Sequence, residues 1–441
     1  MSVASWFSAF HFLRRPCMWI LLAVFTVLFQ AHAGILHRKA VSQSRALLVG
    51  YFGQWSLYHE PPFYVKDLVK SGSAALLDQM NYAQAFVKDG RCSVADSNAD
   101  LNTTYTKENS VSGKADDPAS PFRGYFHQLK ELKRRYPHLK ILISLEGKAS
   151  SFAEDAKPEN RRAFVASCVD TFLRGHFGAG IVEPGIFDGI DVDWEYPEEE
   201  DAENFRALLE EFRTQMNAVR PGLRLSIAVG PHPGREPGTD FSVITRLVDQ
   251  IGVMNYDYIG PWSPTTGFLA PLFPNPEHRS GNIAGSMDAY EAAGVPREKL
   301  LMGVPFYGYG WTGVNTANNG LFQAGHGVQG DRPYRYIRTL AAPDSVYRDL
   351  RSQAPWLFEQ GNFWTYDDPL SVRYKVSYAA QQHLGGVMIW ELSEDTEDAE
   401  LLNAVWQSLR HPLDARAFDE PPAQPSSGNT QGAASGGAAS Q

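Results

Sequence analysis

Residues 187–197 read FDGIDVDWEYP, and this stretch decides how the rest of the 441-residue chain is interpreted. It places Asp191, Asp193 and Glu195 at alternate positions, separated by apolar residues. Side chains alternate between the two faces of a β-strand, so a strand here would present all three carboxyl groups on one face. Burying carboxylates costs several kcal/mol per ion unless each is protonated, paired or hydrogen-bonded. We therefore interpret the row as catalytic.

Two structural explanations fit this stretch less well. A solvated acidic edge would not alternate its acids with isoleucine, valine and tryptophan. A calcium-binding loop that begins at Asp191 would need glycine at its sixth position and glutamate at its twelfth, where the chain has Tyr196 and Ala202. Asp188 has the opposite parity from the acidic row, so we assign it to structural support.

Composition excludes some functions and leaves others open. The chain is 43% hydrophobic and 12% aromatic, which is enough for a large core, and its formal net charge is −10. A nucleic-acid partner is not expected, because no cluster of Lys and Arg interrupts the acidic balance. The aromatic residues would suit stacking on sugars, but a protein core uses the same residue types.

The N-terminal residues have the layout of a secretory signal peptide. Arg14 and Arg15 precede an apolar run over residues 17–29, and Ala-His-Ala follows at 31–33. A run of this length is short for a spanning helix, which needs about 20 residues, although an uncleaved anchor remains an alternative. We expect residues 1–33 to be removed, the protein to be secreted (or periplasmic in a bacterium), and no stable membrane association afterwards.

Two cysteines remain after the signal peptide, Cys92 and Cys168. An even number in an oxidising compartment permits one disulfide, and two unpaired buried thiols fit the sequence equally well. No spacing of Cys and His indicates zinc. We expect neither a metal nor a cofactor, and a monomeric protein.

Apolar strands alternate with helical segments along the chain, which is typical of a parallel sheet. Eight such units predict an α/β fold of the (β/α)8 TIM-barrel type, spanning residues 34–412. We expect residues 306–365 to form a small α+β insertion lobe between the seventh and eighth strands, and residues 413–441 to form a disordered tail. The expected strands cover residues 46–52, 76–86, 139–145, 187–196, 223–229, 251–258, 299–305 and 386–392.

Polar and aromatic residues occur where several of these strands end. The carboxyl ends of barrel strands meet at one face, so these side chains are expected to converge. Carboxyl groups beside tyrosine and tryptophan suit a sugar ring, because aromatic faces stack on its C–H surface and acids exchange protons with its oxygens. The residues concerned are Tyr51, Ser144, Glu146, Asp191, Asp193, Glu195, Met254, Tyr256, Asp257 and Trp390.

Residues 188–195 (DGIDVDWE) resemble the DGxDxDxE signature of family 18 glycoside hydrolases, the chitinase family. Further matches follow in the family's order at residues 140–144 with Gly147, at residues 254–257 (MNYD) and at residues 385–390 (GGVMIW). Residues 306–311 (FYGYGW) are similar to the start of the insertion domain of deep-cleft chitinases. The resemblance covers roughly residues 46–408.

The resemblance implies a role for each matching residue. Glu195 would protonate the leaving glycosidic oxygen and then activate water, while the substrate's own N-acetyl oxygen acts as nucleophile. Asp193 would orient the acetamide and share a proton with Asp191, and Tyr256 would bind the acetamide carbonyl. Trp390 would lie under the cleaved sugar. Further substrate contacts are expected from Tyr51, Ser144, Met254, Asp257 and Trp311, whereas Trp55, Trp262 and Trp364 fit stacking and packing equally well.

One residue departs from the family pattern, which has SxGG after the third strand. Here Glu146 stands before Gly147, and it could bind a sugar hydroxyl, pair with Lys148 or raise the pKa of the acidic row. The implied activity is a chitinase acting on chitin or chito-oligosaccharides. The alternatives are an endo-β-N-acetylglucosaminidase acting on N-glycans and a non-catalytic chitin-binding lectin; such lectins typically lack the last acid of the signature, which is present here.

Overall fold

A computed structural model describes residues 45–147, 149–278 and 280–418. Apart from Arg45, these residues belong to one compact unit that begins at Ala46. The expected signal peptide, Lys148 and residues 419–441 of the expected tail lie outside the described residues. None of the described helices is both long enough and apolar enough to cross a membrane.

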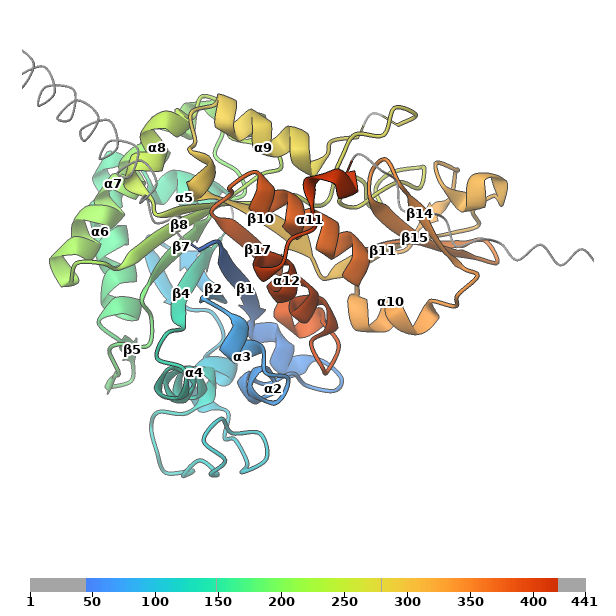
Figure 1. Ribbon diagram of the computed structural model, residues 1–441. Helices are drawn as coiled ribbons and strands as arrows, with labels where there is room; N and C mark the ends of the chain where they lie inside the picture. Colours follow the sequence, from blue (N-terminus) through green and yellow to red (C-terminus); the bar gives the residue numbers. More distant parts are fainter. Residues whose placement is uncertain (1–44, 148, 279, 419–441) are drawn as a thin grey trace, which may run out of the picture. The chain divides into compact units, whose positions relative to one another are not determined.

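Eight parallel strands close into a barrel at the centre of the unit (Figure 1). They pair in the order β1, β17, β10, β9, β8, β7, β4, β2, and pairing between β2 and β1 closes the ring. The TIM-barrel prediction is therefore confirmed. The strands are β1 (Leu47–Gly53), β2 (Gln79–Lys88), β4 (Lys140–Glu146), β7 (Gly189–Asp193), β8 (Arg224–Val229), β9 (Gln250–Val253), β10 (Leu300–Pro305) and β17 (Gly386–Trp390).

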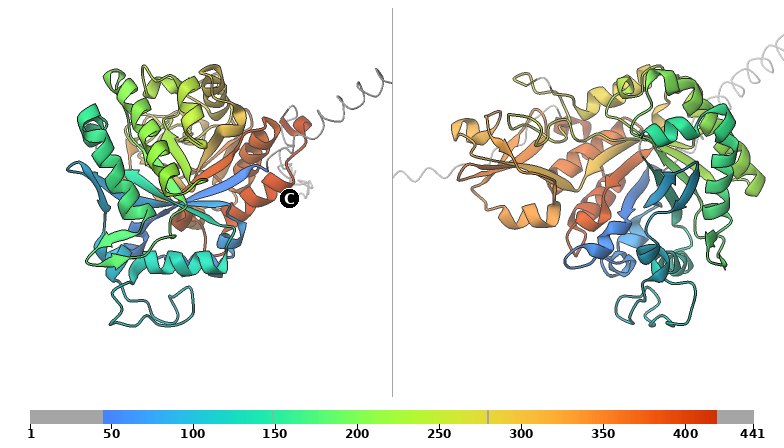
Figure 2. Two further views of the ribbon diagram at one scale, coloured as in Figure 1. Left: turned by 90° about the vertical axis from the view of Figure 1, so that its left-hand side faces the viewer. Right: turned by 180° about the vertical axis from the view of Figure 1, so that it is seen from behind.

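Helices cover the outside of the barrel strands (Figures 1 and 2). Their apolar residues pack on the sheet, as in the fully buried Phe205, Leu208 and Phe212 of the longest helix, α7. The helices are α2 (Val65–Lys70), α3 (Ser73–Leu76), α4 (Gly124–Arg135), α5 (Ala149–Asp155), α6 (Pro158–Cys168), α7 (Ala202–Val219), α8 (Phe241–Leu247), α9 (Ile283–Ala292), α11 (Pro369–Gln381) and α12 (Glu400–Arg410).

Single 3-10 or π turns lie in several connections. They are η1 (Gln54–Tyr58), η2 (Asn98–Asn102), η3 (Val169–Leu173), η4 (Glu199–Asp201), η5 (Pro233–Arg235), η6 (Arg297–Lys299), η7 (Ala317–Gly320), η8 (Leu392–Glu394) and η9 (Ala415–Phe418).

Two strands next to the site end earlier than the sequence pattern indicated. β7 pairs with β4 and β8 only as far as Asp193, so Glu195 lies in the loop beyond the strand and not on its face. β9 likewise ends at Val253, and residues 254–257 form a loop. Alternation of residue types continues past the last ladder hydrogen bond, which is why the sequence pattern overextends both strands.

Other boundaries also differ from the prediction. Leu76 ends helix α3 and does not begin a strand. Residues 89–121, which follow the second expected strand, contain a further strand, β3 (Arg91–Val94), which pairs antiparallel with β2. Residues 413–418, assigned to the tail, are described: the Leu413 carbonyl accepts a hydrogen bond from Gln381, and Phe418 packs against Phe273 and Tyr374.

The insertion between β10 and β17 forms an antiparallel sheet with one helix beside it, α10 (Tyr334–Leu340). Trp311 and Phe363 are fully buried in its apolar cluster, together with Phe268 from the loop after β9. The lobe is therefore joined to the barrel through packed side chains. Its strands are β11 (Tyr307–Thr312), β12 (His326–Gly327), β13 (Arg332–Pro333), β14 (Val346–Asp349), β15 (Ala354–Glu359) and β16 (Asn362–Thr365).

A disulfide joins Cys92 of β3 to Cys168 at the end of α6, with the two Cα atoms 4.7 Å apart. The sequence left this pairing open, and the structure resolves it in favour of the bond.

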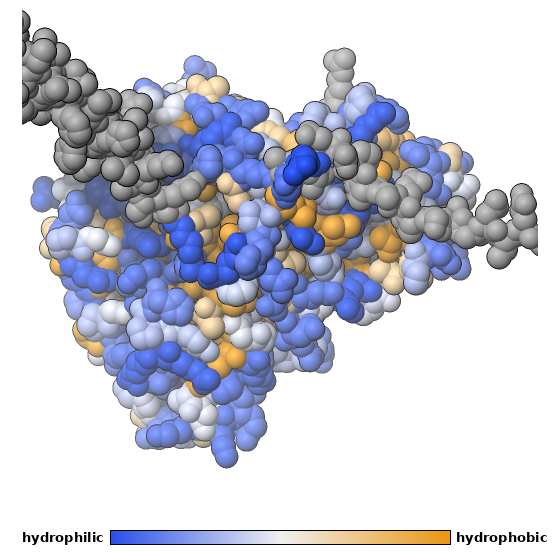
Figure 3. Space-filling view, in the orientation of Figure 1, coloured by the Kyte–Doolittle hydropathy of each residue, from blue (hydrophilic) through white to orange (hydrophobic). Residues whose placement is uncertain are grey.

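A small hairpin of β5 (His176–Gly178) and β6 (Ile181–Val182) follows α6. The face of the molecule in Figure 3 is mainly hydrophilic, with its larger apolar patches toward the lobe.

Candidate active site

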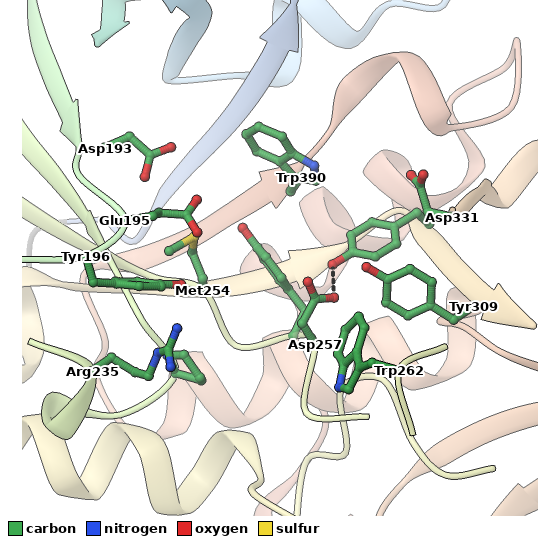
Figure 4. Close-up of a pocket in the computed structure, with 13 residues that line it drawn as sticks. Asp193, Glu195, Tyr196, Arg235, Met254, Asp257, Trp262, Tyr309, Asp331 and Trp390 are labelled. Atoms are coloured by element: carbon green, nitrogen blue, oxygen red, sulfur yellow. Dashed lines mark hydrogen bonds between the residues drawn. The ribbon is translucent and has the colours of Figure 1, made fainter. Parts of the chain in front are cut away.

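A cavity of about 680 Å³ opens beyond the carboxyl ends of β7, β8, β9 and β17 and is bordered on one side by the lobe (Figure 4). The described part of its lining combines carboxyl groups, aromatic rings and one guanidinium group. The lining residues are Asp193, Glu195, Tyr196, Pro231, Arg235, Met254, Tyr256, Asp257, Trp262, Tyr307, Tyr309, Asp331 and Trp390.

Asp193 and Glu195 both line the cavity, as the residue alternation predicted. Asp193 is the last residue of β7 and is buried, whereas Glu195 in the following loop is open to the cavity. Within the described part of the chain, the buried Oδ1 atom of Asp193 has no hydrogen-bond partner. A buried acceptor normally has a donor, so this oxygen is available to a group that enters the cavity.

Asp191 lies deeper in the barrel and is held by three hydroxyl groups. Tyr51 donates to its Oδ2 atom over 2.7 Å, Ser144 donates to the same atom over 2.9 Å, and Ser226 donates to Oδ1. Strand register explains the two serines, because Ser144 of β4 and Ser226 of β8 are the residues paired with Asp191 on either side. Three donors satisfy a carboxyl group that is only 1% exposed.

The carboxyl groups of the site have raised pKa values. Burial raises the pKa of Asp193 well above its usual value, and the charges of Glu195, Asp191 and Glu146 raise it further. Burial and the charge of Asp257 raise the pKa of Glu195, whereas the Tyr196 hydroxyl and the charge of Arg235 lower it. A proton is therefore retained among these acids at higher pH than free carboxylic acids would allow. This favours a general acid.

The opposite part of the cavity carries aromatic and hydroxyl groups. In the view of Figure 4, Trp390 at the end of β17 lies across the cavity from Asp193 and Glu195. Met254 and Tyr256, which follow β9, also line the cavity. The Tyr307 hydroxyl donates to Asp257 over 2.6 Å, which fixes this carboxyl group at the lobe side. Aromatic rings next to hydrogen-bonding groups are suited to binding a sugar ring, because the sugar can stack on the aromatic face.

Three residues expected to bind substrate do not line the cavity. Tyr51 and Ser144 are buried, with their hydroxyl groups directed at Asp191, so they support that residue instead. Trp311 is 0% exposed in the lobe core, and its Nε1–H donates to the Ser263 carbonyl over 3.1 Å. These expectations are corrected: strand-end position alone does not distinguish a lining residue from one below the cavity floor.

The other tryptophans divide between the two roles left open. Trp262 is 62% exposed and lines the cavity, with its ring 5.4 Å from that of Tyr309. Trp364 is buried, and Trp55 packs beside Trp390 with 6.0 Å between ring centroids. Asp188 is structural, as its parity indicated, because it binds Lys133 and Arg220 at the other end of β7.

Several residues that line or support the site were not identified from the sequence. Tyr307 and Tyr309 stand in the quoted FYGYGW segment, so their spacing on β11 could have indicated them. Arg235 and Asp331 lie in irregular segments, where periodicity gives no information. Ser226 could have been found only from the register of β8 against β7.

Glu146 faces the acidic row, because it is paired in register with Asp193 across β4 and β7. Burial and the charge of Glu195 raise its pKa, and Glu146 in turn raises the pKa of Asp193. Of the three roles considered for Glu146, the electrostatic one therefore has structural support. Lys148 lies outside the described residues, so its pairing with Glu146 stays a prediction.

The described residues contain no cluster of His, Cys, Asp or Glu arranged to hold a metal ion. What the cavity offers is acid–base chemistry: an exposed carboxyl group beside a buried one with a free acceptor atom, opposite a tryptophan. Such an arrangement can protonate a leaving oxygen while another group is held next to the reacting carbon.

Comparison with known proteins gives consistent matches. The family model described as "Glycosyl hydrolases family 18" matches residues 47–395. Chitinase C of Streptomyces lividans is 33% identical over 374 residues, which are 80% of this chain and 58% of that protein. Chitinase 63 of Streptomyces plicatus is 32% identical over 384 residues, 82% of this chain and 60% of that protein. The chain thus spans about three fifths of the length of these relatives.

Solved structures match over most of both chains. The catalytic domain of psychrophilic chitinase B from Arthrobacter TAD20 superposes with a TM-score of 0.78 at 30% identity, covering 84% of this chain and 96% of that one. Group IV chitinase of Ostrinia furnacalis in complex with allosamidin has a TM-score of 0.70 at 28% identity, covering 83% and 99%.

Proposed function

Because this chain belongs to glycosyl hydrolase family 18, we propose that it is a chitinase that hydrolyses β-1,4 bonds between N-acetylglucosamine units. The observation that carries the proposal is the placement of Asp193 and Glu195 on one wall of a cavity that Tyr256 and Trp390 complete. Relatives named as chitinases and the insertion lobe support chitin over N-glycans as the substrate.

In the first step, the Glu195 carboxyl group donates its proton to the glycosidic oxygen as the bond to the anomeric carbon breaks. The substrate's acetamide oxygen attacks that carbon and forms a cyclic oxazolinium ion. The free Oδ1 acceptor of Asp193 binds the acetamide N–H, and its charge stabilises the cation. The Tyr256 hydroxyl binds the acetamide oxygen and fixes it in the attacking position.

In the second step, the Glu195 carboxylate takes a proton from water, which attacks the anomeric carbon and opens the oxazolinium ring. Two successive displacements leave the anomeric configuration unchanged, so the product is the β-anomer. Asp191 keeps its three hydroxyl donors throughout. Trp390 supports the apolar face of the reacting sugar.

The test compares the wild type with the Glu195→Gln variant on chito-oligosaccharides. Loss of proton transfer should lower kcat by about 10²- to 10⁴-fold. A matched control is Glu298→Gln, which changes an exposed glutamate of η6 outside the cavity and should retain full activity. Equal rates for the wild type and Glu195→Gln would remove Glu195 from the mechanism.

Three readouts separate the proposed chemistry from its alternatives. NMR of fresh product should show the β-anomer first, and an early excess of the α-anomer would contradict acetamide participation. Oligomers that lack the N-acetyl group should be cleaved slowly, because the nucleophile is missing. Cleavage of N-glycans in preference to chito-oligosaccharides would favour the endo-β-N-acetylglucosaminidase.

We also propose that the protein is exported, on the basis of the signal-like residues 1–33. The disulfide between Cys92 and Cys168 supports this, because such bonds persist in oxidising compartments. N-terminal sequencing of protein recovered from the medium or periplasm should place the first residue after Ala33. Recovery of the intact N-terminus in a membrane fraction would contradict it.

A further inference from the structure

Among the described residues that line the cavity, one is cationic and several are acids. Asp193, Glu195, Asp257 and Asp331 contribute carboxyl groups, and Arg235 is the single Lys or Arg among the described lining residues. None of the sequence patterns identified it. A lone guanidinium group close to a row of carboxyl groups alters how these groups hold their protons.

The loop that carries Arg235 is fixed at both ends. Glu236 accepts a hydrogen bond from the Gly230 amide over 2.7 Å, and the Tyr290 hydroxyl donates to the Gly230 carbonyl over 2.8 Å. Between them, His232 accepts from the Gly234 amide at the start of η5. The backbone that presents Arg235 is therefore held by the protein and does not depend on a bound ligand.

Arg235 packs over the ring of Tyr196, the residue that follows Glu195. Its Cζ atom lies 4.3 Å from the centroid of the Tyr196 ring, a cation–π distance. In the view of Figure 4, the Tyr196 ring lies between Arg235 and Glu195. The Tyr196 hydroxyl also interacts with the Glu195 carboxyl group. The guanidinium group of Arg235 therefore contacts the ring of the residue next to Glu195 in the chain.

Gly230 leaves the space in which this stack forms. A Cβ atom at Gly230 would lie 2.6 Å from both Cβ and Cγ of Arg235 and 3.2 Å from Cε1 of Tyr196. The two 2.6 Å contacts are too close for carbon atoms, so a larger residue at position 230 would displace Arg235 from its Cβ atom outward. The glycine therefore provides a way to move Arg235 without changing the charge of the protein.

We propose that Arg235 is a positioning residue for the general acid. Its planar guanidinium group holds the Tyr196 ring against Glu195. Its positive charge offsets the negative charge of the carboxylates that surround Glu195. This inference rests on the proposed function, in which Glu195 is the acid. It concerns the pH range over which the enzyme works and not whether it works.

The sign of the effect follows from the groups that face Glu195. Burial raises the pKa of Glu195, the Tyr196 hydroxyl lowers it, the charge of Asp257 raises it and the charge of Arg235 lowers it. Without the cation, Glu195 would keep its proton to higher pH, so the alkaline limb of the kcat profile should move to higher pH. The charged and titratable groups around Glu195 are Asp193 on β7, Glu146 on β4, Tyr196 in the same loop, Arg235 on η5, and Tyr256 and Asp257 after β9.

The experiment measures kcat and KM against pH with chito-oligosaccharides for three variants. Arg235→Gln should move the alkaline limb to higher pH, with kcat at the optimum lowered by less than about tenfold because Glu195 remains. Arg235→Lys keeps the charge and should leave the limb near that of the wild type. Gly230→Ala should move the limb in the same direction as Arg235→Gln.

The control is Arg246→Gln, an exposed arginine of α8 that does not line the cavity and whose loss changes the net charge equally. It should leave the pH profile unchanged. If the alkaline limb of Arg235→Gln stays at the wild-type pH while kcat falls, Arg235 has only a structural role, and the inference is overturned. Full activity of Glu195→Gln would instead overturn the proposed function, so the two failures can be told apart.

Discussion

Glu236 gives a pH-dependent stability that can be measured independently of activity. Its side chain is 2% exposed at the end of the Arg235 loop, and burial raises its pKa from 4.5 to about 7. Its hydrogen bonds with the Gly230 amide and the Tyr290 hydroxyl lower the pKa and offset part of this rise. The folded protein therefore binds this proton more tightly than the unfolded chain does.

The sign and size of the effect follow from linkage. The stability that the protonated Glu236 contributes is fully present below about pH 4.5 and is lost as the pH rises through about 7. The rise from 4.5 to about 7 corresponds to a free energy on the order of 3 kcal/mol. In Glu236→Gln, the amide oxygen still accepts from Gly230 and its NH₂ group can donate to Tyr290, but nothing titrates.

Urea unfolding followed by tryptophan fluorescence, across the range from about pH 4.5 to above about pH 7, tests this. The free energy of unfolding of the wild type should fall relative to that of Glu236→Gln by up to about 3 kcal/mol as the pH rises. Asp155 and Asp395, whose pKa values are raised to about 6, titrate in both proteins and cancel in the difference. A difference that stays constant across this range would refute the reasoning.

Three further predictions concern stability and substrate binding. Replacing Cys92 and Cys168 by serine removes a cross-link over a sequence separation of 76 and should lower the free energy of unfolding by about 4 kcal/mol, measured with the reduced wild type as control. Trp311→Ala empties a fully buried site and should cost about 3–5 kcal/mol in thermal or urea unfolding. Trp262→Ala, at a 62% exposed site, should leave stability nearly unchanged and raise KM; a large stability loss would show that its ring packs in the core.

The eight barrel strands and the acidic stretch could be predicted because both depend on local patterns. Runs of apolar residues mark strands buried on both faces, and strict alternation identified Asp193 and Glu195 as neighbours on one wall. The residue at which strand pairing stops could not be predicted, because the end of β7 at Asp193 depends on hydrogen bonds to β4 and β8. Glu195 consequently lies in a loop and not on the strand.

Periodicity and residue type are properties of adjacent positions, so the order of strands and helices and the chemical identity of the acids can be read along the chain. The fold is needed to show which hydroxyl groups hold Asp191, that Trp311 packs in the lobe while Trp262 faces the cavity, and that Arg235 stacks on Tyr196. These relations join residues far apart in the chain. Strand register, closure of the barrel and packing of irregular loops fix them, and none of the three leaves a periodic signal in the sequence.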